Sequence, residues 1–232
     1  MNAPAREQSG RVHRFSAVEL LITLVLLFVS SPFVQSLHHG AAIEAALMTL
    51  MLISAVLAVG GKRRTLLFTA LLATPAVVGR WVHHFRSDWM PLPAYLAASL
   101  VFVAFVIVNL LRFVLRSSRV NAEVLCASIS AYLMLGLLWA LAYTLEAQTN
   151  PNAFAFNTPG AASGTMAGSE AFYFSFVTLS TVGYGDITPV SNVARMLAVT
   201  EAMTGLLYTA VLISRLVALY SAPSAHEQRD ED

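Results

Sequence analysis

The chain has few charged residues and a single cysteine. Asp, Glu, Lys and Arg make up 12% of its 232 residues and hydrophobic residues 57%, against about 25% charged in a typical soluble domain. So few charges cannot cover a water-exposed surface, which excludes an ordinary soluble protein. Cys126 alone excludes an intrachain disulfide, and the formal net charge of +1 does not indicate a nucleic-acid partner. We predict an all-α integral membrane protein surrounded by a lipid bilayer.

Several patterns typical of enzymes are missing as well. The sequence has no nucleophile–base arrangement, no phosphate-binding glycine loop and no cysteine metal cluster. We therefore predict that the chain is not an enzyme and carries no cofactor.

Six apolar stretches are long enough to cross a hydrocarbon core of about 30 Å. They are Phe15–Val34, Ala41–Val59, Thr65–Val82, Leu92–Val114, Val124–Leu145 and Ala194–Tyr220. If the N-terminus is cytoplasmic, eleven of the fourteen Lys and Arg residues fall in inner segments and three in outer ones. The positive-inside rule then predicts a multi-pass protein of the plasma (cell inner) membrane with both termini in the cytoplasm.

These spans suggest four parts along the chain. Residues 1–14 form a cytoplasmic tail, 15–119 a four-helix transmembrane module, 120–221 a pore domain and 222–232 a second short cytoplasmic tail. Between the fifth and sixth spans, residues 147–168 carry no charge and are rich in Asn, Thr, Gly, Pro and Ala, so we expect an irregular outer loop.

A shorter helix and a special segment follow this loop. Residues 168–180 read as a helix with Ser169 as its N-cap and Glu170 at its positive end. At about 1.5 Å per residue this helix is too short to cross the membrane. Non-helical backbone at membrane depth, as expected for residues 181–186, is tolerated only where it lines a water-filled path or is buried in protein. Together the two segments predict a re-entrant pore loop.

The amino-acid sequence of this loop resembles that of a known protein family. Residues 181–185 read TVGYG, the string of potassium channel selectivity filters, and residues 178–189 (TLSTVGYGDITP) resemble the potassium channel family throughout. The sixth span also resembles that family, because Gly205 falls where many members have a hinge glycine. The resemblance covers about 121–220, close to half of the chain.

The resemblance implies a potassium-selective filter. In such a filter the backbone carbonyls, with a threonine hydroxyl at the inner end, replace the water around K⁺, which is the transported ion. The residues concerned are Thr181, Val182, Gly183, Tyr184 and Gly185. Successive carbonyls point the same way only if right-handed and left-handed backbone conformations alternate. Glycine adopts the left-handed conformation at little cost, which favours glycine at every second position. Because each chain has one such motif, three identical subunits must join it in a homotetramer.

Three residues are expected to support the filter, namely Asp186, Tyr173 and Thr178, and one acidic residue lies inside the sixth span. Asp186 follows the filter at the outer mouth, and Tyr173 is the expected hydrogen-bond donor to it. Glu201 is an ionisable group inside the sixth span. We expect it to bond to a hydroxyl of the pore helix, such as that of Thr178 or Ser180; a gating or proton-sensing role is the alternative.

The inner helix offers a hinge and a gate. Gly205 is either a hinge or a site of close helix packing. Thr209, Ile213 and Val217 share a face with Leu206 on a 3.6-residue period, and the apolar members of this face could close the pore by dewetting.

The first four spans leave the gating stimulus open. The fourth span has no charge from Leu92 to Leu111, which predicts weak or absent voltage gating. Two histidine pairs are expected on the outer side, where they could bind a metal ion or sense protons, or only mark helix ends: His38, His39, His83 and His84. Alternatives are therefore a pore gated through these helices by outer pH or metal, and a non-conducting or regulatory subunit.

Overall fold

Seven helices and two short strands make up the computed structural model, which describes residues 5–34, 40–59, 63–85, 91–117, 120–157 and 166–220. In chain order they are α1 (Ala5–Val34), α2 (Gly40–Val59), α3 (Arg63–Phe85), α4 (Leu92–Arg116), α5 (Ala122–Thr149), β1 (Phe154–Phe156), α6 (Ser169–Leu179), β2 (Ile187–Pro189) and α7 (Asn192–Tyr220).

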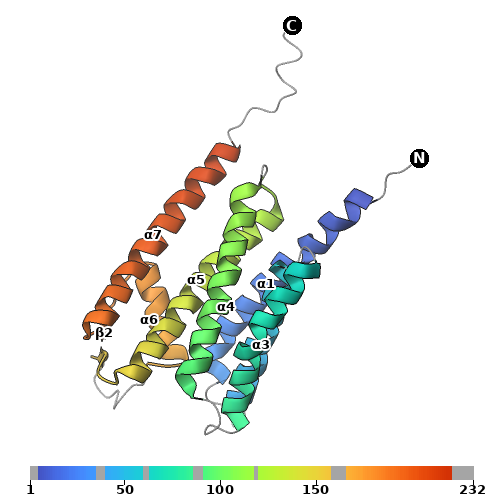
Figure 1. Ribbon diagram of the computed structural model, residues 1–232. Coiled ribbons are helices and arrows are strands. Elements are labelled where there is room, and N and C mark those ends of the chain that lie inside the picture. The colour runs from blue at the N-terminus through green and yellow to red at the C-terminus, as the bar shows by residue number, and fades with distance from the viewer. Residues whose placement is uncertain are drawn as a thin grey trace.

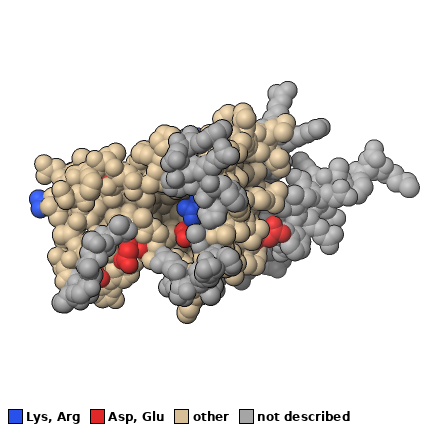
Figure 2. All heavy atoms as spheres, turned by 90° about the horizontal axis from the view of Figure 1, so that it is seen from below, with Lys and Arg blue, Asp and Glu red and all other residues tan. Residues whose placement is uncertain are grey.

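Within the described residues, five helices are long and apolar enough to cross a membrane. The matching segments are Ala42–Val59, Thr65–Val82, Leu92–Arg116, Ala122–Thr149 and Asn192–Arg215. α1 contributes a shorter apolar stretch, Ala17–Ser31. The predicted all-α membrane fold is confirmed, whereas the count of six spans stays a prediction because the first span is represented only by this shorter stretch. Viewed from below, most of the described surface belongs to uncharged residues (Figure 2).

The helices are arranged so that α5 stands at the centre of the molecule. α4 and α1 pack against one side of α5, and α6 and α7 pack against the other (Figure 1). α2 and α3 complete the bundle of the first four helices (Figure 1). The start of α1 and the end of α7 lie at the same end of the bundle in that view. The pore loop is therefore held on a scaffold to which the first four helices also contribute.

Side-chain caps mark the starts of the two helices that frame the pore loop. Asn121 accepts a hydrogen bond from the backbone N–H of Val124 (2.9 Å) at the start of α5, and Ser191 accepts one from Ala194 (3.0 Å) at the start of α7. Such caps satisfy backbone donors that the first helical turn leaves unpaired. The Ser191 hydroxyl also donates to Glu146 (2.9 Å), which ties the start of α7 to the end of α5.

Two details of the predicted outer loop were wrong. Ser169 is the first residue of α6, and the capping position is Gly168, at φ 58°, without a side-chain cap. The loop is also not wholly irregular, because β1 pairs antiparallel with β2, with Ala155 opposite Thr188. Strands of three residues are too short to show a period in the sequence, and this pairing joins segments about thirty residues apart.

Candidate functional site

Residues 181–185 form a non-helical segment whose backbone alternates between positive and negative φ. Among the described residues, φ is positive at Thr181 (59°), Gly183 (57°) and Gly185 (79°), as well as at Gly168, but not at Val182 or Tyr184. This alternation turns successive carbonyl groups toward the same side of the strand. The prediction for the two glycines matches this geometry, whereas sequence reasoning missed Thr181, a β-branched residue for which a positive φ is costly. The segment is therefore shaped to present a row of backbone oxygens.

The glycines of this segment are needed for their backbone angles and not for space. A Cβ added at Gly183 or Gly185 would meet nothing within 4 Å. The inner end of the segment is held to the pore helix α6, because the N–H of Val182 donates to the carbonyl of Val177 (2.9 Å) and that of Thr181 to the carbonyl of Thr178 (2.9 Å). The C-terminal end of α6 thus sets the position of the first oxygens.

The outer end of the segment is held by Tyr173 and Asp186. The Tyr173 hydroxyl donates to a carboxylate oxygen of Asp186 (2.6 Å), and the Tyr173 ring stacks on the Tyr184 ring with centroids 6.5 Å apart. The hydrogen bond from Tyr173 is the main reason that the pKa of Asp186 is lowered from its ordinary value. The structure therefore brings together the donor and acceptor that the sequence paired.

Asn157 also lies at the Asp186 end of this segment, although no pattern in the sequence pointed to it. Its side-chain amide donates to the carbonyl of Gly185 (3.0 Å) and to the Thr188 hydroxyl (3.2 Å). Its backbone N–H donates to the carbonyl of Asp186 (2.6 Å). The pairing of β1 with β2 places Asn157 there, so only the fold reveals this support of the outer mouth.

Two glycines allow α6 to approach its neighbouring helices closely. A Cβ on Gly136 of α5 would overlap the Phe176 ring, and a Cβ on Gly205 of α7 would collide with the carbonyl oxygen of Leu179. The second contact lies at the C-terminal end of α6, next to the row of oxygens. Of the two readings of Gly205 from the sequence, these contacts favour close helix packing.

Glu201 is fully buried where α5, α6 and α7 meet. One of its oxygens accepts a hydrogen bond from the Tyr143 hydroxyl, and the other lies 2.5 Å from the Ser175 hydroxyl oxygen. The expected contact with a pore-helix hydroxyl is present, but naming Thr178 or Ser180 as the partner was wrong. Ser180 lies beyond the helix end and donates to the carbonyl of Phe176 (2.6 Å).

A helical spacing could have identified Ser175 as the partner. Phe172, Ser175 and Leu179 recur at intervals of three and four residues, so they share a buried face of α6. Thr178 lies on a neighbouring, half-buried face of the helix. The signal was the single hydroxyl among the apolar residues of that face.

The predicted gate residues lie on an open side of α7. Ile213 and Val217 are more than half exposed, and the Thr209 hydroxyl donates to the carbonyl of Gly205 (2.9 Å). Many further large apolar side chains of α7 are exposed in the single chain: Val193, Met196, Val199, Met203, Leu206, Leu207 and Val211. A single chain therefore leaves most of this helix uncovered.

Arg215, near the end of α7, makes a contact that the sequence did not suggest. Its guanidinium donates to the carbonyls of Val114 (3.1 Å) and Ser117 (2.7 Å), at the C-terminal end of α4. A cation is favourable there because the last carbonyls of a helix are unpaired and carry partial negative charge. The C-terminal part of α7 is thereby fastened to the end of α4.

The histidine pairs do not form a described site. His38 and His39 lie outside the described residues, and so do the side chains of His83 and His84 at the end of α3. The nearby ion pair between Arg80 and Glu44 (3.3 Å) joins α3 to α2 within the described part of the chain. A metal or proton site at the histidines stays an expectation from the sequence.

Comparison with known proteins agrees with this geometry. A family model described as "Ion channel" matches residues 133–222, which include α6, the segment 181–185 and α7. "Protein LctB" of Bacillus caldotenax is 34% identical over 101 residues, which are 43% of this chain and 74% of that protein. No solved structure matches the chain.

Two further relatives carry potassium channel names. "Inward rectifier potassium channel Kirbac3.1" of Paramagnetospirillum magnetotacticum is 35% identical over 94 residues, or 40% of this chain and 28% of that protein. "Two-pore potassium channel 4" of Arabidopsis thaliana is 45% identical over 49 residues, or 21% of this chain and 17% of that protein. The chain thus covers only a small part of these two relatives.

The fold and the pore loop define a helical membrane protein with a re-entrant segment. With the comparisons, the chain belongs to the potassium channel family of ion channels. The prediction that it is not an enzyme is confirmed by this membership.

Proposed function

We propose that the chain is one subunit of a homotetrameric channel that conducts K⁺ passively and selectively across the membrane. The observation that carries the proposal is the TVGYG segment with positive φ at every second residue, from Thr181 to Gly185. Carbonyls of Thr181, Val182, Gly183 and Tyr184, with the Thr181 hydroxyl, supply the oxygens that replace the hydration shell of K⁺.

The pore helix contributes electrostatically to the same task. The C-terminal end of a helix carries about half a negative charge from its aligned peptide dipoles. In α6 this end, near Leu179 and Ser180, adjoins the inner end of the filter. Four such ends around one axis stabilise a cation in the low-dielectric middle of the membrane without an acidic ring.

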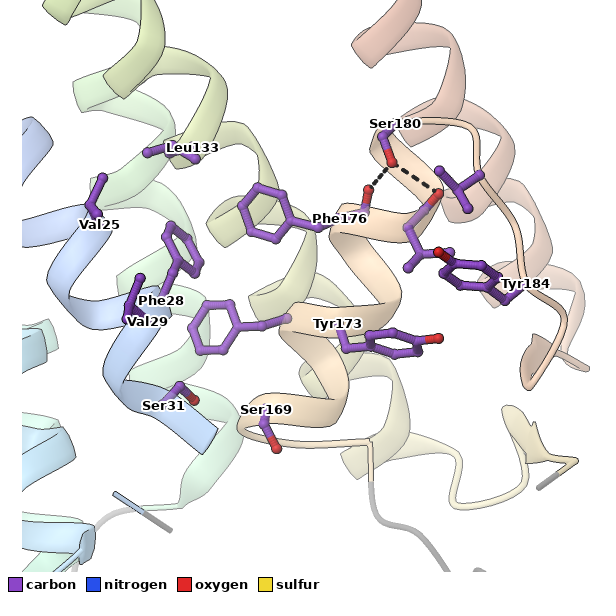
Figure 3. Close-up of a pocket in the computed structure, with 13 residues that line it drawn as sticks. Val25, Phe28, Val29, Ser31, Leu133, Ser169, Tyr173, Phe176, Ser180 and Tyr184 are labelled. Atoms are coloured by element: carbon purple, nitrogen blue, oxygen red, sulfur yellow. Dashed lines mark hydrogen bonds between the residues drawn. The ribbon is translucent and has the colours of Figure 1, made fainter. Parts of the chain in front are cut away.

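The surface of the single chain supports assembly. Val182 and Tyr184, which belong behind the filter, are 53% and 72% exposed, and they border an apolar groove of about 660 Å³ between α1 and α6 (Figure 3). In Figure 3, Phe28 of α1 points toward Phe176 on one side of α6, whereas Tyr173 and Tyr184 lie on the other. Three identical subunits cover these side chains and the apolar face of α7.

The gate of the pore lies on the inner helix, α7. An apolar ring at Ile213 or Val217 closes the pore by dewetting, and the first four helices serve as scaffold and assembly elements with weak or absent voltage sensing. In this proposal, residues 15–119 form the four-helix module and residues 120–221 the pore domain. The protein lies in a plasma (cell inner) membrane, and both of its termini face the cytoplasm.

Two glycine substitutions test the filter directly in liposomes that hold only this protein. Gly185→Ala imposes an unfavourable φ on the filter and is expected to lower K⁺ flux and K⁺-over-Na⁺ preference by at least about tenfold. Gly168→Ala imposes a similar φ outside the filter and serves as the matched control, with selectivity expected to remain. Equal loss of selectivity in both, or a wild-type protein without flux, as for a non-conducting subunit, contradicts the proposal.

A further inference from the structure

Glu201 is the one fully buried acidic residue of the described chain. It lies on α7, one helical turn before Gly205, and contacts one residue of α5 and one of α6. An ionised carboxylate at such a place costs several kcal/mol unless it is paired with a cation or fully hydrogen-bonded. Among the described residues the only ion pair is Arg80–Glu44, so no described cation pairs with Glu201.

The number of available protons decides the charge of Glu201. The Ser175 hydroxyl oxygen lies 2.8 Å from the carbonyl oxygen of Gly136 and 2.5 Å from a carboxyl oxygen of Glu201. A serine hydroxyl has one hydrogen to donate, and a carbonyl can only accept. If Ser175 donates to Gly136, the short contact with Glu201 needs a hydrogen that Glu201 itself carries.

A protonated Glu201 satisfies every group in the cluster. Tyr143 donates to one carboxyl oxygen, the other carboxyl oxygen donates its own hydrogen to Ser175, and Ser175 donates to the carbonyl of Gly136. An ionised Glu201 would take the Ser175 hydrogen, and the oxygens of Ser175 and Gly136 would then lie 2.8 Å apart with no hydrogen between them. Two acceptor oxygens repel each other at that distance, even though the Gly136 carbonyl keeps its helical hydrogen bond within α5.

No neighbouring titratable group changes this account. From α5, Tyr143 contacts Glu201 and Tyr132 lies near it, and neither is an acid at neutral pH. On α6, Tyr173 binds Asp186 and Glu170 is exposed. On α7 itself, the Tyr208 hydroxyl donates to the carbonyl of Ser128 (2.5 Å).

We propose that Glu201 is a neutral carboxylic acid that latches the pore helix to the inner helix, and that it is a positioning residue for the filter. It holds Ser175 on the buried face of α6, while Gly205, one turn further along α7, meets the carbonyl of Leu179 at the end of α6. The two contacts fix the height and rotation of α6, and through them the first filter oxygens. This last consequence and the charge argument that follows it rest on the proposed function.

Because the latch is neutral, the negative potential near the filter comes from the helix dipoles and not from Glu201. Four ionised Glu201 residues in a tetramer would add four negative charges close to the ion path, more than the roughly two supplied by four helix ends. The latch therefore holds α6 in place without adding charge to the ion path.

Infrared spectroscopy of the full chain in lipid at neutral pH tests the protonation state. A protonated carboxylic acid has a carbonyl stretching band that an ionised carboxylate lacks, and this band is expected in the wild type and absent in Glu201→Gln. Glu146→Gln, at the outer end of α5, is the matched control and is expected to keep the band. A spectrum in which Glu201→Gln removes only an ionised-carboxylate band overturns the proposal.

Flux measurements test the positioning role. Gln offers one acceptor and one donor in the same geometry as the neutral acid, so Glu201→Gln is expected to keep K⁺-over-Na⁺ preference within about twofold of wild type. Glu201→Leu and Ser175→Ala, which break the chain of hydrogen bonds, are expected to lower it by about tenfold. If Glu201→Leu does not assemble, Ser175→Ala still decides.

The outcomes separate this proposal from the proposed function. A Glu201→Gln variant that is as impaired as Glu201→Leu shows that the charge is needed and overturns the latch. A wild-type protein that conducts no K⁺ overturns the channel proposal, while the infrared band still reports whether Glu201 is neutral.

Discussion

The guanidinium of Arg215, near the end of α7, donates a 2.7 Å hydrogen bond to the carbonyl of Ser117, 98 residues earlier in the chain and just beyond α4. A second bond reaches Val114 in the last turn of α4. Ile213 and Val217, the proposed gate, lie two residues before and two residues after Arg215 on the same helix, so their side chains point away from α4. The end of α4 is thus joined to the part of α7 that carries the proposed gate.

Arg215→Ala is expected to weaken this junction. Hydrogen bonds from a charged donor contribute about 1.5–3 kcal/mol each, so the variant should lose about 2 kcal/mol or more of unfolding free energy and alter the fraction of time that the channel is open. Arg215→Lys keeps the charge with one donor nitrogen and should fall between. Thermal unfolding and single-channel recordings measure both effects, with Arg116→Ala, an exposed cation at the end of α4, as control. Identical behaviour of the Arg215→Ala and Arg116→Ala variants contradicts the prediction.

Gly205→Ala distinguishes a packing glycine from a hinge. In an uncrowded helix this change stabilises by up to about 1 kcal/mol, because alanine has the higher helix propensity. Here the added Cβ collides with the carbonyl of Leu179, so the change should destabilise by about 1–3 kcal/mol. The sign of the shift in thermal unfolding is the measurement, and Ala210→Gly, at an exposed site of α7, gives the propensity effect alone. A Gly205→Ala variant that is more stable than wild type would favour the hinge.

The Tyr173–Asp186 contact should make the outer mouth sensitive to acid. Because this bond lowers the pKa of Asp186, its stabilising contribution is complete above the ordinary aspartate pKa of about 3.9 and is lost as pH falls through the lowered value. Tyr173→Phe removes the donor, raises the pKa of Asp186 toward its ordinary value and should speed the decline of current during sustained opening. When the outer pH is lowered, the acid-induced loss of stability at the outer mouth should also begin at a higher pH in this variant than in the wild type.

Recordings of current decline across outer pH check this prediction. Asp186→Asn, which has no carboxyl to titrate, is the control and should show no such acid dependence. A Tyr173→Phe variant with wild-type kinetics at every pH would remove the role of the contact.

Voltage should open this channel only weakly. Steep voltage dependence needs three to four gating charges per subunit, each worth about 2.3 kcal/mol per 100 mV. α4 is uncharged from Leu92 to Leu111, and Arg112 and Arg116 come only near its C-terminal end, where both are exposed. Arg112→Gln should therefore leave the slope of the conductance–voltage curve unchanged. A wild-type conductance–voltage curve that rises steeply within about 100 mV, and that is flatter in the Arg112→Gln variant, would contradict this prediction.

The parts of the site that local chemistry determines could be predicted from the sequence. The TVGYG letters, the short length of α6 and the single buried acid in the sixth span pointed to a pore loop and to Glu201. Gly183 and Gly185 were expected at positive φ because only glycine adopts it at little cost.

The parts that depend on distant contacts could not be predicted. Thr181 takes a positive φ against its own preference, Asn157 reaches the mouth only because β1 pairs with β2, and Arg215 finds its acceptors about one hundred residues away. Ser175, by contrast, was recoverable from helical spacing, because Thr178 and Ser180 do not lie on the buried apolar face of α6.

The reversal potential of the purified, reconstituted protein between K⁺ on one side of the membrane and Na⁺ on the other tests the central claim most directly. A row of backbone oxygens at 181–185, closed into rings by four chains, predicts a potential near that of a membrane permeable to K⁺ alone. A potential near zero, which means that Na⁺ passes as readily as K⁺, would contradict the account.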